Sequence, residues 1–214
     1  MHYKENGAFF TMSLFEQRSA EARFRMVKER HTKSLENAIT EKKIDPLMIP
    51  ISNYIATTKE FFTTSTCSGR ITLMDLDETE KKREGAFFRK WHRTVTFDEV
   101  WEGICDETNT GNVWFKQDGL VVLIGTNTLE NAKHVLNVVH NLGIKRVGIN
   151  HFEPGKIHIE LFGTQHMSVP VKRGKEILAG KEYVKELVKL ANKKWKLNDK
   201  TLKKLCAALK KELK

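Results

Sequence analysis

The sequence is poor in cysteine, and its three cysteines are not paired along the chain. Cys67, Cys105 and Cys206 lie far apart, with no C-x-x-C spacing. This pattern argues against a disulfide framework and against a zinc knuckle, because both need cysteines that are close together or even in number. A reducing cytoplasm is the compartment that fits this cysteine usage best.

Long apolar runs are missing as well. No stretch approaches the roughly 20 apolar residues that a bilayer span needs. The start of the chain has no hydrophobic segment followed by a small-residue cleavage site, so we expect no secretory signal. With 214 residues, 40% of them hydrophobic and 30% charged, the composition is that of a soluble globular protein with a substantial core and no membrane segment.

Acidic residues are in deficit, and the deficit is concentrated at the C-terminal end. The formal net charge is +10. Residues 181–214 hold twelve lysines against four acidic residues, a difference of +8. A polyanion such as RNA is the natural partner for such a surface. A solvated lysine-rich helical surface, common in heat-adapted proteins, has the same composition and is the alternative.

Hydrophobic periodicity and capping residues predict both helices and strands. Helices are expected over 16–41, from Asp45 onward, from Thr96, from Asn127 or Thr128 to about Leu142, and twice within 181–214. Strand patterns occur at 70–76, 86–97, 112–116, 120–124, 146–150, 156–162 and 166–171. Gly143 is well placed to end the helix before it.

These elements do not alternate as regular βαβ units, and no G-x-G-x-x-G or Walker pattern is present. We therefore predict an α+β fold with a mixed β-sheet flanked by helices. No Pro- or Gly-rich linker interrupts the chain, so we expect one domain over residues 1–214. Within this domain, about residues 1–15 could be disordered. The lysine-rich C-terminal helices occupy residues 181–214.

A stretch of small residues stands out at 61–70, with the sequence FFTTSTCSGR. Small hydroxyl residues beside a glycine favour a turn whose backbone groups are accessible. Gly69 permits close approach to the backbone, and Arg70 supplies a planar fork of donors that suits a carboxylate or phosphate. We interpret residues 61–70 as a loop that holds a ligand.

Two pairs of residues have competing interpretations. Cys67 and His92 could be a nucleophile and its base, but a buried thiol beside an unrelated histidine is favoured, because spacing identifies no Asp or Asn to orient the histidine. Trp91 and His92 could stack on a base and supply a group that titrates near neutrality. Inward packing of Trp91 from an edge strand fits equally well.

We expect no metal site, because no three ligands have metal spacing, even among His151, His158 and His166.

Several motifs of this sequence resemble those of the tRNA wybutosine-synthesising protein 3 family. The small-residue stretch in the form EFFTTSTCSGRI is followed by FFRKWH, and the likeness runs from about Lys33 to the C-terminus. It includes EKKIDPLMIPI, VWFKQDGLVVLIGTNTLENAKHVL and IELFGTQHMSVPV. The resemblance implies an S-adenosylmethionine-dependent methyltransferase without a Rossmann-type fold. Its substrate would be a 4-demethylwyosine-type guanosine at position 37 of tRNA(Phe), beside the anticodon, methylated on ring nitrogen N4.

The resemblance also implies roles for individual residues. Four residues of the small-residue stretch would bind the cofactor, namely Ser65, Cys67, Ser68 and Gly69. Arg70 and Trp91 would bind the substrate. The catalytic residues would be His92 and Asp45, either of which could accept a proton if the reaction needs an acceptor.

The sequence departs from the family pattern at two positions. Leu123 stands where a histidine is expected, in the strand after the central tryptophan, and Ala56 stands where an asparagine is expected before the small-residue stretch. If either of the expected residues helps to bind cofactor or substrate, the chain is a divergent methyltransferase or a non-catalytic RNA-binding paralogue. That paralogue is the alternative to an active methyltransferase.

Overall fold

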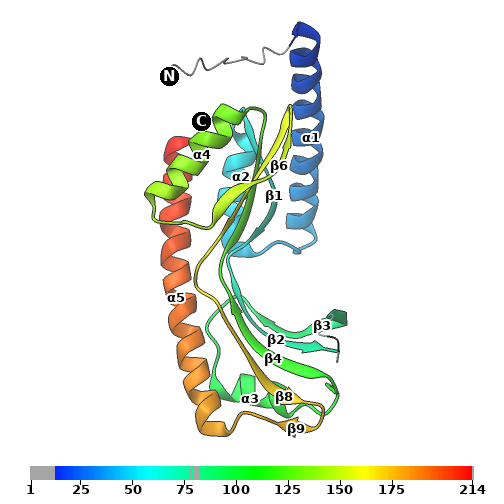
Figure 1. The fold of residues 1–214 in the computed structure, drawn as a ribbon, viewed down its shortest axis with the longest axis vertical. Coiled ribbons are helices and arrows are strands. Elements are labelled where there is room, and N and C mark those ends of the chain that lie inside the picture. Colours follow the sequence, from blue (N-terminus) through cyan, green and yellow to red (C-terminus); the bar gives the residue numbers. More distant parts are fainter. Residues whose placement is uncertain (1–12, 78, 80–81, 214) are drawn as a thin grey trace, which may run out of the picture.

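The structure is a computed structural model that describes residues 13–77, 79 and 82–213. Two antiparallel sheets form its framework, one above the other in Figure 1. The first sheet has the strand order β1 (Phe61–Cys67), β5 (Val121–Thr126), β7 (Lys156–Phe162) and β6 (Val147–Glu153). The second has the order β3 (Lys82–Trp91), β2 (Arg70–Leu76), β4 (Asn112–Asp118), β8 (Met167–Arg173) and β9 (Glu176–Ile177).

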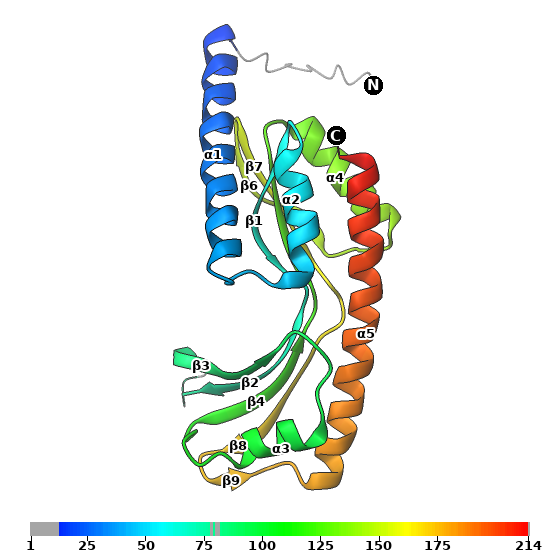
Figure 2. The same ribbon diagram turned by 180° about the vertical axis from the view of Figure 1, so that it is seen from behind.

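Helices pack on both faces of the first sheet and on one face of the second (Figures 1 and 2). On one side α1 (Leu14–Thr40) packs Phe24 and Val27 against Phe62 of β1. The main core of the first sheet lies on the other side, and a second core lies between the second sheet and two helices. The remaining helices are the 3-10 helix η1 (Pro46–Met48), α2 (Ile49–Thr57), α3 (Phe97–Cys105), α4 (Leu129–Asn141) and α5 (Lys181–Glu212).

Local signals in the sequence place most of these elements correctly. The side chains of Thr96 and Thr128 accept hydrogen bonds from the backbone of the first turns of α3 and α4, as N-caps do. Gly143 adopts a φ of 79° directly after α4, a conformation that favours glycine. The predicted α+β class is confirmed. The prediction of one domain stays a prediction, and residues 1–12 of the segment considered for disorder lie outside the described residues.

Three predictions about individual elements are wrong. The strands form two sheets, and every pairing between them is antiparallel, so there is no mixed sheet among the described residues. Residues 61–67 are strand β1 rather than a loop, because they pair with β5 despite their small side chains. The C-terminal region is the single helix α5, since no glycine or proline interrupts residues 181–212.

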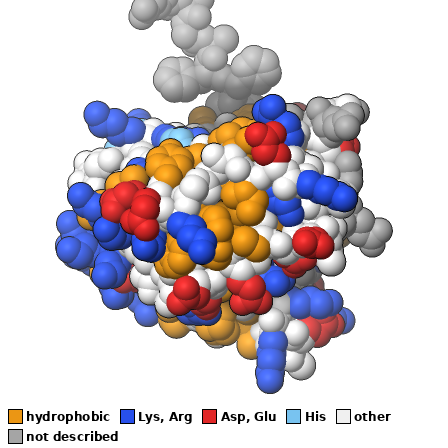
Figure 3. Space-filling model, turned by 90° about the horizontal axis from the view of Figure 1, so that it is seen from below, with side chains coloured by type: hydrophobic (Ala, Val, Ile, Leu, Met, Phe, Trp, Pro, Cys, Tyr) orange, Lys and Arg blue, Asp and Glu red, His pale blue; other side chains and the backbone are white. Residues whose placement is uncertain are grey.

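Helix α5 runs the length of both sheets (Figure 1). Its apolar side chains are divided between the two cores, with Leu187 in the second and Leu205 in the first. Lysine side chains occupy its outer surface, and Figure 3 shows Lys and Arg gathered along the margin on which α5 lies in Figure 1. None of the helices in the described part of the chain combines the length and apolar composition needed to cross a bilayer.

The chain passes between the two sheets at three places that lie together, 68–69, 119–120 and 163–166, which we call the waist. Asn198 of α5 is buried there, with an exposure of 1%. Its Oδ1 accepts a hydrogen bond from Leu120 N at 2.7 Å, and its Nδ2 donates to Ser68 O. Gly69 has a φ of 99°, and a Cβ at this position would lie 2.7 Å from Asn198 Nδ2. The waist therefore needs both the glycine and the buried amide.

We expect Asn198→Ala to lower the free energy of unfolding by about 2–4 kcal/mol, because it leaves two buried backbone groups without partners. Denaturant unfolding measures this loss. Asn150→Ala is the matched control, since Asn150 is exposed and makes one surface hydrogen bond to Glu160; its effect should stay within about 0.5 kcal/mol. A loss for Asn198→Ala no larger than that of the control would show that the waist does not depend on this amide.

Candidate active site

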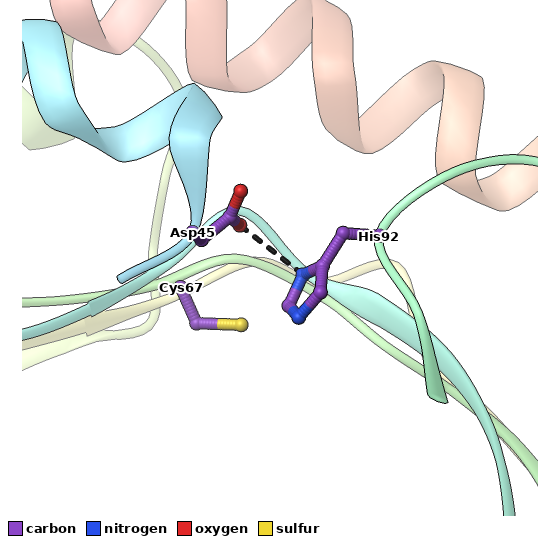
Figure 4. A group of neighbouring side chains, drawn as sticks. All are labelled: Asp45, Cys67 and His92. Carbon is purple, nitrogen blue, oxygen red and sulfur yellow. Dashed lines mark ion pairs between the residues drawn. The ribbon is translucent and has the colours of Figure 1, made fainter. Parts of the chain in front are cut away.

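Asp45 and His92 form a hydrogen-bonded pair at the waist (Figure 4). Asp45 is the N-cap of η1, where its Oδ1 accepts from Leu47 N at 3.1 Å. Its Oδ2 accepts from Ser68 N at 2.8 Å and lies 3.2 Å from His92 Nδ1. His92 Nδ1 also lies 2.9 Å from Gly69 O. Because both neighbours of this nitrogen are acceptors, Nδ1 carries the hydrogen and the imidazole ring is held in one orientation.

The pair shifts the pKa values of both side chains. The hydrogen bond to Asp45, followed by a contribution from Cys67, raises the pKa of His92 to about 10. Burial by itself would raise the pKa of Asp45, but hydrogen bonds from His92 and Ser68 together outweigh it and lower that pKa to about 2. At neutral pH the pair is therefore an imidazolium beside a carboxylate.

Cys67 completes the cluster. One polar atom from each of Asp45, Cys67 and His92 lies within 4.8 Å of the other two, and Figure 4 shows the thiol beside the imidazole ring. The acidic partner of the histidine, which sequence spacing did not reveal, is thus Asp45. The three groups are close enough to hold a metal ion. The hydrogen bonds of Asp45 with Leu47 N and Ser68 N, and of His92 Nδ1 with Gly69 O, account for the same arrangement without one. We therefore interpret the cluster as a hydrogen-bonded site.

A groove of about 590 Å³ lies beside the cluster, and Cys67 belongs to both. Ile71 and Leu73 of β2 point into the core shared with α3 and α5. Arg70 alternates with them along the strand, so its side chain lies on the opposite face, where it lines the groove. Charged, aromatic and hydroxyl side chains share the walls, among them Ser65, Phe87, Lys116, Asp118, Arg146, Phe162, His166 and Ser168.

Two arginines of the groove are stacked on phenylalanine rings. The Arg70 guanidinium lies 4.5 Å from the ring centroid of Phe87, and its Nε lies 3.2 Å from Asp118 Oδ2. The Arg146 guanidinium lies 5.5 Å from the ring centroid of Phe162. Stacking of this kind holds a guanidinium plane in place while its N–H groups stay available for a ligand.

The structure brings most of the residues predicted for the site together. Asp45, Cys67, Ser68, Gly69 and His92 meet at the waist, and two more, Ser65 and Arg70, line the groove. Their roles stay predictions.

Unlike the other predicted site residues, Trp91 lies neither at the waist nor among the residues that line the groove. It is paired with Ile71 of β2 and packs in part against the second core, which matches the inward-facing alternative. Sequence reasoning missed Asp118, Arg146 and Phe162. Strand pairing and the waist bring these residues into the groove, and nothing in their spacing along the chain indicates it.

Comparison with known proteins identifies the family. The family model Methyltransferase TYW3 matches residues 25–211. The chain belongs to the TYW3 methyltransferase family. The resemblance found in the motifs is confirmed, and with it the prediction that the protein is a methyltransferase, an enzyme that needs a methyl donor.

Relatives and solved structures agree with this family. A Thermococcus kodakarensis relative, named tRNA(Phe) 7-((3-amino-3-carboxypropyl)-4-demethylwyosine(37)-N(4))-methyltransferase 1, is 33% identical over 77% of this chain and 83% of its own. A Pyrococcus horikoshii relative with the same name is 32% identical over 85% of this chain and 92% of its own. The solved structure of PH1069 protein from Pyrococcus horikoshii superposes with a TM-score of 0.80 at 29% identity, covering 92% of this chain and 97% of the other. The TYW3 fold is thus not of the Rossmann type, as predicted.

A His92→Gln variant tests the pair in this TYW3 protein through the pH dependence of stability. The pKa of His92 in the folded protein, about 10, lies above the ordinary value of 6.5. Its stabilising contribution is therefore complete below about pH 6.5 and is lost as the pH rises through about 10. We expect the thermal midpoint of the wild type to fall between about pH 7 and 10 by more than that of His92→Gln, as measured by circular dichroism. His140→Gln, at an exposed position of α4, should behave as the wild type, and parallel curves for wild type and His92→Gln would contradict the assignment.

Proposed function

We propose that this protein transfers a methyl group from S-adenosylmethionine to N4 of a demethylwyosine-type guanosine at position 37 of tRNA(Phe). The observation that carries the proposal is the meeting of three distant motif segments beside one groove: Asp45 and His92 contact residues 67–69, and Ser65, Cys67 and Arg70 of the same segment line the groove. The relatives named for this reaction support it, since they match most of the chain. A cytoplasmic location and contact with the anticodon region belong to the same proposal.

The groove has the chemistry that S-adenosylmethionine would require. That donor combines an adenine ring, ribose hydroxyls and a charged amino-acid end with the sulfonium that supplies the methyl group. The walls of the groove offer aromatic rings, the hydroxyls of Ser65 and Ser168, and charges of both signs. We assign donor contacts to Ser65 and Cys67, which line the groove. Ser68 and Gly69, to which the resemblance also gives donor binding, are buried at the waist, so we assign them the role of holding the backbone next to Cys67.

Methyl transfer is a displacement in line with the breaking bond, so the residues of the site mainly have to hold two reactants at the right distance. His92 is protonated at neutral pH because its pKa is about 10. We therefore assign it the role of a fixed, charged hydrogen-bond donor, with Asp45 as the group that orients it. Accepting a proton would require the neutral imidazole, or a carboxylate oxygen of Asp45 released from its backbone partner.

A non-catalytic RNA-binding paralogue is the second candidate, and the position of Leu123 favours it. Leu123 of β5 is paired with Ser65 of β1, so the family's histidine would stand beside a residue assigned to the donor. Calorimetry with S-adenosylmethionine separates the candidates, because the paralogue would bind none with or without tRNA. Mass spectrometry of tRNA(Phe) nucleosides from a strain lacking the gene tests the reaction, and an unmethylated tricyclic base should accumulate.

Arg70→Lys separates a ligand-binding role from a structural one. Lysine keeps the charge beside Asp118 but cannot offer two parallel N–H groups to a carboxylate or phosphate. We expect the thermal midpoint to stay nearly unchanged while methyl transfer falls at least about tenfold, equivalent to roughly 1.4 kcal/mol in the barrier. Full activity with a lowered midpoint would mean that Arg70 braces the sheet instead.

The lysines of α5 supply a second test, directed at the tRNA. Lys193, Lys196, Lys200 and Lys204 form an exposed stripe, and within the described ranges no carboxylate lies at ion-pair distance from them. Replacing all four by glutamine should weaken tRNA binding and flatten its dependence on salt, since each phosphate contact contributes about 0.9 to the logarithmic slope.

The control for this variant removes the same charge from the same helix. It replaces by glutamine four lysines that already pair with acids, namely Lys185, Lys189, Lys203 and Lys211. Filter binding over a range of salt concentrations measures both variants. Equal losses in the two would show that net charge, rather than the stripe, attracts the tRNA.

A further inference from the structure

The ion pair between Arg70 and Asp118 is set into the wall of the groove as a unit. The two residues are direct partners in the pairing of β2 with β4. Their side chains are 31% and 35% exposed, so the pair is partly shielded from water but open to a ligand. Phe87 supports the guanidinium from one side at 4.5 Å. The ion pair and the ring together fix the position of both charges.

Each member of the pair keeps unused hydrogen-bonding capacity. The contact joins Arg70 Nε to Asp118 Oδ2 at 3.2 Å. Among the described residues, neither the terminal Nη atoms of Arg70 nor Asp118 Oδ1 makes a further hydrogen bond. The pair thus presents two parallel N–H donors next to a free carboxylate oxygen.

This arrangement selects one class of ligand. A carboxylate fits the two Nη groups of Arg70, and an ammonium group on the adjacent carbon could bind Asp118 Oδ1. A phosphate would meet the same arginine but would be repelled by the aspartate. Lys116 and Arg146 line the same groove and, over the described part of the chain, have no carboxylate at ion-pair distance. Simple anions therefore have better positions elsewhere in the groove.

We propose that Arg70 and Asp118 together bind an α-amino-acid head group, with the carboxylate on Arg70 and the ammonium on Asp118. The proposal rests on the proposed function for the identity of the ligands, two of which carry this group. One is the methionine part of the methyl donor. The other is the 3-amino-3-carboxypropyl side chain that appears in the names of the relatives' reaction. In the second case the pair determines substrate specificity.

The test compares ligands that differ only in the head group. Calorimetry measures the affinity for S-adenosylmethionine and for its decarboxylated form. Kinetics measure kcat/KM for tRNA(Phe) whose tricyclic base carries the aminocarboxypropyl chain and for tRNA(Phe) whose base lacks it. If the pair binds the donor, the wild type should bind S-adenosylmethionine at least about tenfold more tightly than its decarboxylated form; this is the calorimetric arm of the test. If the pair binds the substrate, kcat/KM should be at least about tenfold higher for the base with the chain; this is the kinetic arm. The reason is the same in both arms, because a ligand without the head group leaves charged groups of the site unpaired.

Arg70→Gln and Asp118→Asn should each reduce that preference to about twofold or less in the same arm. Lys116→Gln is the matched control: it removes a cation from the same groove and should leave the preference as in the wild type. A change in the calorimetric arm assigns the head group to the donor, and a change in the kinetic arm assigns it to the substrate.

A preference that survives both substitutions in both arms would overturn the proposal, as would an equal loss in Lys116→Gln. The calorimetric arm needs no methyl transfer, so it still tests the pair if neither tRNA is methylated. Failure of the proposed function is a different result: donor binding by the wild type without methylation of either tRNA. Thermal midpoints of all variants near that of the wild type ensure that the comparison concerns folded protein.

Discussion

The buried amide of Asn198 is the contact on which the rest of the structure depends. The three chain connections of the waist join the two sheets, and helix α5 is the element that packs along both of them (Figure 2). Asn198 ties that helix to two of the crossings, through Ser68 O and Leu120 N. Glycines are needed around it, because a Cβ at Gly69 or Gly163 would lie within 2.8 Å of its side chain. An amide suits this position since it donates to one crossing and accepts from the other without bringing in a charge.

The candidate site follows from the same contact. Ser68 uses its carbonyl for Asn198 and its N–H for Asp45, and the next carbonyl, of Gly69, accepts from His92. The backbone that holds the sheets together therefore also orients the imidazolium. This explains how a largely buried ion pair can be tolerated: its partners are fixed backbone dipoles as well as the opposite charge, so little of its hydrogen-bonding capacity is left unused. The charged side chains of the neighbouring groove are therefore available to bind ligands, because the hydrogen bonds of the waist do not use them.

Sequence reasoning reached the parts of this arrangement that are encoded locally. Thr96 and Thr128 as caps and Gly143 as a stop depend on their immediate neighbours in the chain. The motif residues of the waist were reached only through the resemblance to the family, because their contacts join distant segments. The division into two sheets is not encoded locally either, because it depends on which strands pair, and a strand of small hydroxyl residues such as β1 has no local signal for its partner. For the same reason Asp118 could not be associated with Arg70 before the register of β2 and β4 was known. Residues 61–67 misled for a physical reason: their turn-forming composition is outweighed by pairing with β5.

The two departures from the family pattern have different weight once they are placed in the fold. Ala56 contributes its carbonyl oxygen, which accepts a hydrogen bond from Lys28 at 3.1 Å and helps to anchor α1. Any residue supplies a carbonyl, so this contact does not depend on the expected asparagine. Leu123 is different, because it is the direct strand partner of Ser65, and a leucine there removes a polar group next to the groove. The hydrogen bonds of Asp45, Ser68 and His92 described above involve neither position. The substitution at 123 therefore lies beside a residue of the groove and leaves the hydrogen bonds of the waist as they are.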